Sequence, residues 1–481
     1  MSGTTVADVV VDGLKRAGAS RLFAAAPAQA GRPFLAAARA HGLPVTIAPS
    51  ETAACVMAAV TGDLVDAPGA ALIDGDSVVA ARALDRLDRA ALIVLTSVGT
   101  PALSGCKETL GIEAVSAAHR IAHAARLAMT EPRGTVHLAL GPGVATAAAV
   151  PLATSCRPDP PPYPDGAALD RAARELSKAS RPLVLAGIHC RASGASHWLR
   201  AFVEALPAPL LTTARAKGAL PDPHPLMLGV LGAGGPEARL LRRADLVIGL
   251  GLDTAEAEAL PEACWSSAPV LGLGPAAAPD GRVPAAHVAG DVSAIIEELA
   301  TRLRDKPRAD WDVAEVDRLR REGAARGGGD APIARVVRLA REASSTGTIA
   351  TVDAGPYRAS VLAAWHATAP REFLASNASA PGFALPAALA ACLVHPDRRV
   401  VCFTGAGELA PASAELETGA RLAARLVIVA HETAGTDASE SMRLADELGI
   451  AVAAVEDDAA FSRAFGRAFT ADGGSLIVVR F

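Results

Sequence analysis

A glycine turn around residue 406 has the composition of a phosphate-binding loop. The apolar run 400–403 (VVCF) leads through Thr404 into Gly405-Ala406-Gly407-Glu408 and then into a stretch of helical character. Glycines let backbone N–H groups approach an anion closely, and the start of a helix adds partial positive charge. The turn therefore predicts an anion site, with a purely structural turn as the alternative. No acidic residue ends a second strand about 20 residues later, so a dinucleotide site is not supported.

Glu51 is a second residue whose position suggests chemistry. It lies between Ser50 and the apolar run 53–60 (AACVMAAV), for which we predict a helix. A carboxyl group beside an apolar helix can share a proton with a ligand nitrogen. The alternative is that Ser50 caps the helix and Glu51 complements its dipole.

Two histidines form a possible metal pair. His119 and His123 lie four residues apart in a predicted helix and share one of its faces. No third ligand is evident, so two exposed helix histidines are the alternative. The chain has no Walker A loop, G-x-S-x-G elbow or H-E-x-x-H motif, and three large hydrolase classes therefore lack support.

Composition excludes several kinds of partner. The net charge is −5 and aromatic residues make up only 3% of the chain, which argues against nucleic acid. Apolar runs stop well short of the roughly 20 residues that span a bilayer, so no membrane is expected. The start of the chain lacks the pattern of a secretory signal, and seven cysteines are scattered singly. We therefore predict a cytoplasmic protein.

The chain of 481 residues is long enough for several domains. Two segments have the composition of linkers: the proline-rich stretch 156–166, and the stretch 304–331, which ends in a glycine cluster. These cuts predict domains at 1–155, 166–303 and 332–481.

In each predicted domain, apolar runs of four to eight residues alternate with alanine-rich helical stretches. This alternation predicts an α/β fold in which each domain has a mainly parallel sheet covered by helices. The clearest predicted strands are 90–97, 135–140, 182–187, 208–213, 244–251, 347–353, 398–405, 424–431 and 475–481.

These segments together resemble the thiamin-diphosphate enzymes related to acetolactate synthase, benzoylformate decarboxylase and oxalyl-CoA decarboxylase, over nearly the whole chain. Residues 5–27 resemble the family's first helix and strand, and Glu51 falls where the family's catalytic glutamate opens the next helix. Residues 181–195, 208–232 and 244–251 resemble the central domain in order and spacing. The resemblance thus implies a pyrimidine-binding, a central Rossmann-like and a diphosphate-binding domain.

The resemblance continues through the third domain, with two changes at the expected metal site. Residues 377–388 (NASAPGFALPAA) resemble the segment before the family's metal motif, and 398–433 resembles the motif itself. There the family has Gly-Asp-Gly and a closing Asn-Asn, whose aspartate and asparagine hold Mg²⁺ on the cofactor's phosphates. This chain has Ala406, and then Glu432 and Thr433. Only Glu408 or Glu432 is available as a replacement oxygen ligand.

The first domain departs from the family as well. Residues 72–77 (LIDGDS) stand where the family has Gly-Pro-Gly after a strand, and the stretch 105–135 is shorter than usual. Both changes affect regions that shape the cofactor pocket and the substrate entrance in the family.

The resemblance implies a thiamin-diphosphate-dependent decarboxylase or carboligase that acts on a 2-oxo acid, with pyruvate as the default donor. Glu51 would protonate the aminopyrimidine, and residues 405–408, 432 and 433 would bind the diphosphate. The family places its cofactor between two subunits, so a homodimer or homotetramer is implied.

Two other readings remain open. Ala406 and the missing Asn-Asn also fit a cofactor-free family member that acts as a binding or regulatory subunit, or that uses the cleft for different chemistry. Some relatives bind FAD or ADP in the central domain, but strand-terminal glycines such as those of 182–187 and 244–251 usually serve only as turns. We therefore do not expect FAD.

Overall fold

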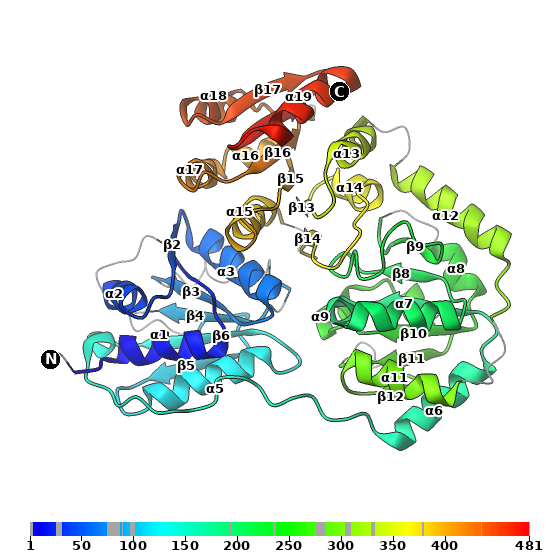
Figure 1. Ribbon diagram of the computed structural model, residues 1–481, viewed down its shortest axis with the longest axis horizontal. Coiled ribbons are helices and arrows are strands. Elements are labelled where there is room, and N and C mark those ends of the chain that lie inside the picture. The colour runs from blue at the N-terminus through cyan, green and yellow to red at the C-terminus, as the bar shows by residue number, and fades with distance from the viewer. Residues whose placement is uncertain are drawn as a thin grey trace.

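Three α/β domains pack around a common junction (Figure 1). The computed structural model describes residues 3–25, 31–74, 87–88, 90–96, 102–192, 194–233, 237–266, 268–275, 284–303, 309–328, 332–377, 380–433 and 435–480. In Figure 1 the C-terminal domain lies above, with the N-terminal domain below it at the left and the central domain below it at the right. The extended segment 151–165 joins the two lower domains.

The N-terminal domain contains a six-stranded parallel sheet in the order β2-β1-β3-β4-β6-β5. Its strands are β1 (Leu22–Ala25), β2 (Val45–Ala48), β3 (Gly69–Ile73), β4 (Leu92–Thr96), β5 (Glu108–Ile112) and β6 (Thr135–Leu140). Its described helices are α1 (Val6–Ala17), α2 (Arg32–Ala40), α3 (Glu51–Val65) and α5 (Ala117–Met129), with a short 3-10 turn, η2 (Val144–Thr146).

The central domain has the sheet order β12-β11-β10-β7-β8-β9, again with parallel pairs. Its strands are β7 (Pro182–Ala186), β8 (Leu210–Thr212), β9 (Met227–Val230), β10 (Leu246–Leu250), β11 (Val270–Leu273) and β12 (Ala286–Val288). Its helices are α6 (Gly166–Lys178), η3 (Ile188–Arg191), α7 (Ala195–Ala205), α8 (Glu237–Arg243), α9 (Thr254–Ala259), α10 (Ala263–Ser266) and α11 (Val292–Arg302).

The C-terminal domain repeats the plan with the order β14-β13-β15-β16-β18-β17. Its strands are β13 (Ile349–Val352), β14 (Phe373–Ala375), β15 (Val400–Gly405), β16 (Leu426–His431), β17 (Ala451–Val455) and β18 (Ser475–Val479). Its helices are α13 (Pro332–Ala343), α14 (Arg358–Ala364), α15 (Ala384–Val394), α16 (Ala406–Leu409), α17 (Ser413–Arg421), α18 (Ser439–Glu447) and α19 (Asp458–Thr470).

Helix α3 joins the N-terminal and C-terminal domains. It is apolar on almost every side because it packs on its own sheet and also against α15 of the C-terminal domain. The buried side chains of both domains consequently form one continuous core. This packing fixes the position of Glu51, the first residue of α3, relative to the C-terminal domain.

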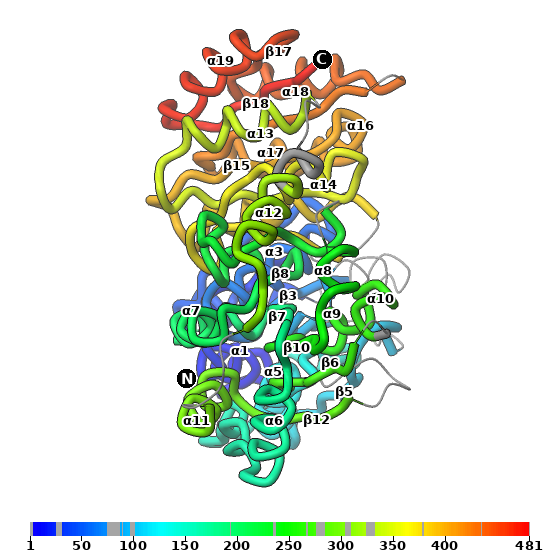
Figure 2. Tube along the Cα trace, turned by 90° about the vertical axis from the view of Figure 1, so that its right-hand side faces the viewer, coloured from blue at the N-terminus to red at the C-terminus, as the bar shows by residue number. Residues whose placement is uncertain are grey.

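The second predicted linker differs from the expectation, because it contains helix α12 (Val313–Gly328). Val316 and Leu319 are buried against the central domain, and Glu315 and Glu322 pair with Arg243 and Arg239 of α8. These contacts offset the low helix propensity of the glycines at its end. Figure 2 shows α12 lying between the central and C-terminal domains.

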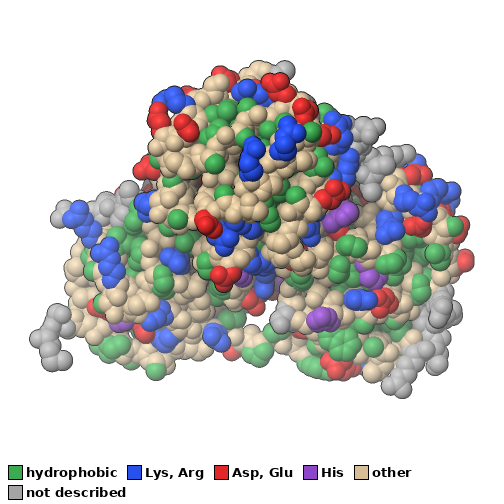
Figure 3. Space-filling model, turned by 45° about the horizontal axis from the view of Figure 1, so that its top comes forward, with side chains coloured by type: hydrophobic (Ala, Val, Ile, Leu, Met, Phe, Trp, Pro, Cys, Tyr) green, Lys and Arg blue, Asp and Glu red, His purple; other side chains and the backbone are tan. Residues whose placement is uncertain are grey.

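The surface in Figure 3 mixes acidic and basic side chains over all three domains. Among the described helices, none is both long enough and apolar enough to cross a bilayer.

Candidate active site

Glu51 is held at the carboxyl end of strand β3. Ser50 caps α3. Its Oγ accepts the backbone N–H of Ala53, with 3.0 Å between Oγ and N. The backbone N–H of Asp74, one residue beyond β3, donates to Glu51 Oε1 over 3.0 Å. The predicted cap and the functional position of Glu51 therefore coexist, because the cap uses the serine and leaves the carboxylate facing the end of the sheet.

The thiol of Cys55 lies one helical turn after Glu51 and is fully buried. Burial, and then the charge of Glu51, raise the pKa of this thiol well above its usual range. A thiolate nucleophile is therefore not available at this end of α3.

The glycine turn at the end of β15 is filled by its own side chains. A Cβ atom added to Gly405 would collide with Glu408 Oε2 and would lie 3.2 Å from ring carbon Cε1 of Tyr357. Burial raises the pKa of the Glu408 carboxyl, which also accepts its own backbone N–H. An internal carboxylate thus occupies the face of the turn where an anionic ligand was predicted.

The turn also contacts the segment that follows β16. A Cβ at Gly407 would lie 3.3 Å from Cγ2 of Thr436, and the Thr433 N–H donates to Thr436 Oγ1 over 2.9 Å. The structure thereby brings the predicted positions Gly405, Gly407 and Thr433 into one region at the carboxyl edge of the sheet.

Neither of the two candidate replacement ligands is placed to hold Mg²⁺. Glu432 Oε1 lies 3.4 Å from Arg480 Nε, and its Oε2 accepts the Ala438 N–H at 3.4 Å. Glu408 turns back onto Gly405, and Ala406 contributes only a buried methyl group. No group of three or more histidine, cysteine or acidic side chains suited to a metal occurs among the described residues, and His119 and His123 are both exposed.

Asp353 and Tyr357 belong to this region although the sequence did not single them out. Asp353 follows β13, is buried, and accepts the N–H groups of Gly382 and Phe383 at 2.9 Å each. Burial raises the pKa of its carboxyl despite these bonds. The sequence could have indicated Asp353, because it is an acid directly after the apolar run 349–352. Residues just beyond parallel strands gather at one edge of a sheet.

In the central domain, Glu256 fills the crevice that would receive a nucleotide. Its carboxyl group accepts from Ile188 N at 2.8 Å, Asp253 N at 3.1 Å and Thr213 Oγ1 at 2.5 Å. A Cβ at Gly187 would lie 2.7 Å from Glu256 Oε2. Burial, with the nearby charge of Asp253, raises the pKa of Glu256 to about 7.

A cavity of about 260 Å³ lies between the central and C-terminal domains. Arg358, Asn377 and Thr213 supply polar groups to its wall, while Leu231 and Leu362 supply apolar surface. The Arg358 side chain makes no hydrogen bond or ion pair with any residue of the described part of the chain, although the charges of Asp88 and Asp353 act on it. It is therefore a cation available to an anionic ligand.

The chain thus combines three parallel-sheet domains with a glutamate that opens a helix in the first and a glycine turn in the third. Two family models match: the thiamine pyrophosphate enzyme central domain over residues 169–299, and the C-terminal thiamine pyrophosphate-binding domain over 353–438. The solved benzoylformate decarboxylase of Polynucleobacter necessarius has a TM-score of 0.79 and 17% identity, covering 98% of both chains. The predicted three-domain fold is confirmed.

Curated relatives agree with the family models. The catabolic acetolactate synthase of Raoultella terrigena is 28% identical over 88% of this chain and 81% of its own length. The acetolactate synthase isozyme 1 large subunit of Escherichia coli is 29% identical over 55% of this chain, but the match spans only about half of that relative, 48%. The central and C-terminal domains of the chain are therefore those of a thiamine pyrophosphate-dependent enzyme, and the relatives support the same family.

The family implies thiamin diphosphate, and the described residues fit the two ends of that cofactor unequally. Glu51 fits the aminopyrimidine end, since its carboxylate lies at a helix start beside the end of β3. The Mg²⁺-diphosphate end does not fit, because Ala406 has no oxygen and Glu408 places negative charge on the turn. Residues 75–77 of the altered 72–77 segment, and 378–379, lie outside the described residues.

Proposed function

We propose that this protein is a thiamin-diphosphate-dependent decarboxylase or carboligase that acts on a 2-oxo acid. The observation that carries the proposal is the position of Glu51, whose carboxylate opens α3 and accepts the backbone N–H of Asp74. In this function Glu51 holds the proton that is exchanged with the cofactor's aminopyrimidine. The cofactor itself supplies the nucleophilic carbon for 2-oxo acid chemistry.

Arg358 supports an anionic substrate. Its guanidinium lines the cavity between the central and C-terminal domains, and no carboxylate of the described residues pairs with it. A guanidinium binds a carboxylate through two parallel hydrogen bonds, which favours a 2-oxo acid over a neutral aldehyde. The apolar part of the wall, formed in part by Leu231 and Leu362, suits an aliphatic or aromatic remainder.

A homodimer or homotetramer is part of the proposal. In the family the cofactor lies between the first domain of one subunit and the third domain of another. Glu51 would then act toward the C-terminal domain of a second copy. Sedimentation of the purified protein tests this point directly.

A second candidate function is supported by the glycine turn. Glu408 and Tyr357 fill the face of Gly405, and Ala406 lacks the ligand that anchors Mg²⁺. These features suit a family member that has lost the cofactor and serves as a binding or regulatory subunit. The same features would arise in an enzyme that displaces Glu408 when the cofactor arrives.

Titration calorimetry with thiamin diphosphate, with and without Mg²⁺, separates the two candidates. The proposed enzyme binds the cofactor in the micromolar range, and Glu51→Gln weakens that binding. Glu440→Gln, on the exposed first turn of α18, is a matched control that should leave it unchanged. Absence of binding at millimolar cofactor would refute the catalytic function and support the second candidate.

A further inference from the structure

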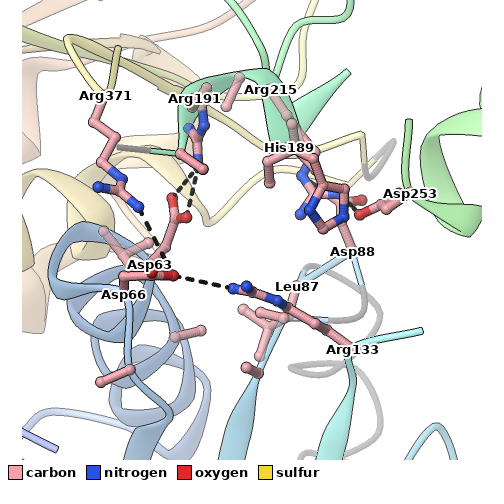
Figure 4. A pocket seen from close by; sticks show the side chains of 18 of the residues that line it. Asp63, Asp66, Leu87, Asp88, Arg133, His189, Arg191, Arg215, Asp253 and Arg371 are labelled. Carbon is pink, nitrogen blue, oxygen red and sulfur yellow. Dashed lines mark hydrogen bonds and ion pairs between the residues drawn. The ribbon is translucent and has the colours of Figure 1, made fainter. Parts of the chain in front are cut away.

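A second polar cavity lies where all three domains meet, beside the C-terminal half of α3 (Figure 4). Its volume is about 100 Å³. Since Glu51 begins α3 and this cavity adjoins residues 59–67, about two to four turns later, the two sites lie toward opposite ends of one helix. The cavity is thus distinct from the proposed catalytic position.

Ion pairs between domains form part of the cavity wall. Arg191 Nη2 of the central domain contacts both oxygens of Asp63 of α3, at 2.6 and 2.7 Å. Arg371 of the C-terminal domain approaches Asp66 only to 4.0 Å, which is too long for a hydrogen bond. Figure 4 shows Arg191 and Arg371 entering from one side of the cavity, with Asp63 and Asp66 below them.

Both arginines keep unused donors. The Nε atoms of Arg191 and Arg371 are buried and have no hydrogen-bond partner among the residues that the structure describes. The Arg191 side chain is only 4% exposed. A buried donor on a charged group that lacks an acceptor is costly, so an oxygen atom of a molecule in the cavity would be stabilised by these donors.

Two further observations concern the wall. Arg371 is a non-glycine residue with a positive φ angle of 64°, a conformation that clusters at binding and catalytic sites, whereas the φ of 53° at Asp66 is that of the left-handed cap that ends α3. Burial opposes ionisation of Asp63, yet the charges of Arg191, Arg371 and Arg215 outweigh it and lower the pKa of that carboxyl. The arginines thus stabilise negative charge at the part of the wall around Asp63, while Asp88 and Asp253 also line the cavity.

The size of the cavity limits the ligand. A water molecule takes about 30 Å³ of liquid volume, so 100 Å³ holds roughly three waters or a molecule of about four to six non-hydrogen atoms. A carboxylate has two oxygens in one plane, and it therefore matches the N–H donors of a guanidinium better than a halide ion does.

We propose that the cavity at the three-domain junction binds a small carboxylate, of about four to six non-hydrogen atoms, through Arg371 and Arg191. Because these arginines come from different domains and face Asp63 of α3 and Asp66 just beyond it, the bound carboxylate would tie the C-terminal and central domains to the N-terminal domain. Occupancy would therefore stabilise the assembled chain against unfolding.

Thermal unfolding of the full-length protein, without thiamin diphosphate, tests the proposal with sodium pyruvate and sodium acetate as probes. Sodium chloride at equal ionic strength is the reference. We expect each carboxylate to raise Tm by about 2 °C relative to chloride. The increase should vanish in Arg371→Gln and persist in Arg200→Gln, which alters an exposed ion pair on α7.

Arg358→Gln serves as the second control, because it removes the cation from the other cavity. An increase that persists in Arg358→Gln assigns the carboxylate to the junction, and one that disappears there overturns the proposal. An equal increase with chloride, or no loss in Arg371→Gln, would also overturn it. If Arg371→Gln does not fold, Arg371→Lys is the alternative variant, because it keeps the positive charge but lacks the paired N–H donors of the guanidinium. Calorimetry should then show pyruvate binding weakened at least ~10-fold.

Discussion

The carboxylate of Glu408 lies against the α-carbon of Gly405, in the space that a side chain at position 405 would need. The glycine turn at the end of β15 therefore carries an internal negative charge where the family binds a diphosphate. Any anion that binds this turn must displace the carboxylate or have it neutralised.

Glu408→Gln should raise the affinity for thiamin diphosphate about tenfold, because it removes one like charge from a half-buried site. Titration calorimetry at pH 8 measures the change. Burial raises the pKa of Glu408, so part of the parent protein becomes neutral as the pH falls, and the advantage of the variant should shrink at pH 5.5. An affinity equal to that of the parent at both pH values would show that Glu408 does not compete with the cofactor.

Ala406→Asp should make cofactor binding depend on Mg²⁺. The substitution returns an oxygen ligand to the turn, and Mg²⁺ requires near-octahedral oxygen coordination. Calorimetry with and without Mg²⁺ should show a gain of at least ~10-fold from the metal in the variant, beyond any gain in the parent. Ala410→Asp, one helical turn later at an exposed position, is the control and should show no such gain.

Arg358→Gln should raise KM for a 2-oxo acid about tenfold or more with a smaller effect on kcat. The guanidinium lines the cavity between the central and C-terminal domains and forms no ion pair with the described residues, so its loss would remove uniform binding of the substrate carboxylate. Arg443→Gln, on the exposed face of α18, is a matched control that should change neither constant. An unchanged KM in Arg358→Gln would remove the support for this cavity as the substrate site.

Glu256 should make the stability of the protein decrease with rising pH. Its pKa is raised from 4.5 to about 7 in the folded chain, so between these values the folded state binds the proton more tightly than the unfolded state does. The stabilisation is present below pH 4.5 and is lost as the pH rises toward 7, by about 3 kcal/mol in total. Chemical denaturation at pH 5 and pH 8 measures it.

The control for that prediction is Glu256→Gln, which cannot titrate. The free energy of unfolding of this variant should change less between pH 5 and pH 8 than that of the parent. If the parent and the variant show the same pH dependence, other groups are responsible and Glu256 is not the titrating residue.

The sequence predicted the strands well because parallel strands covered on both faces are continuous apolar runs, as at 400–403 and 426–430. It also predicted the start of α3, since Ser50 is a strong capping residue directly before an apolar helix. It did not predict α12, whose stability comes from tertiary contacts of Val316 and Leu319 that no local pattern reveals.

The sequence also could not predict which charged side chains fill the sites, because their partners are distant in the chain. Glu256 meets Ile188 across 68 residues, and Arg191 meets Asp63 across 128 residues. Such pairs depend on how strand ends and domains come together, which composition and spacing do not specify. The position of Glu408 over Gly405 is local in sequence, but it depends on a side-chain conformation that the turn allows and does not dictate.

CO₂ release from pyruvate and other 2-oxo acids by the purified protein, with excess thiamin diphosphate and Mg²⁺, tests the proposed function most directly. We predict turnover by the parent, and a loss of about 100-fold or more in kcat for Glu51→Gln, since general acid–base groups contribute factors of this order. Glu440→Gln should keep the parent rate. Turnover that is equal in Glu51→Gln and the parent would contradict the assigned role of Glu51, and no turnover by the parent at any cofactor concentration would contradict the proposed function.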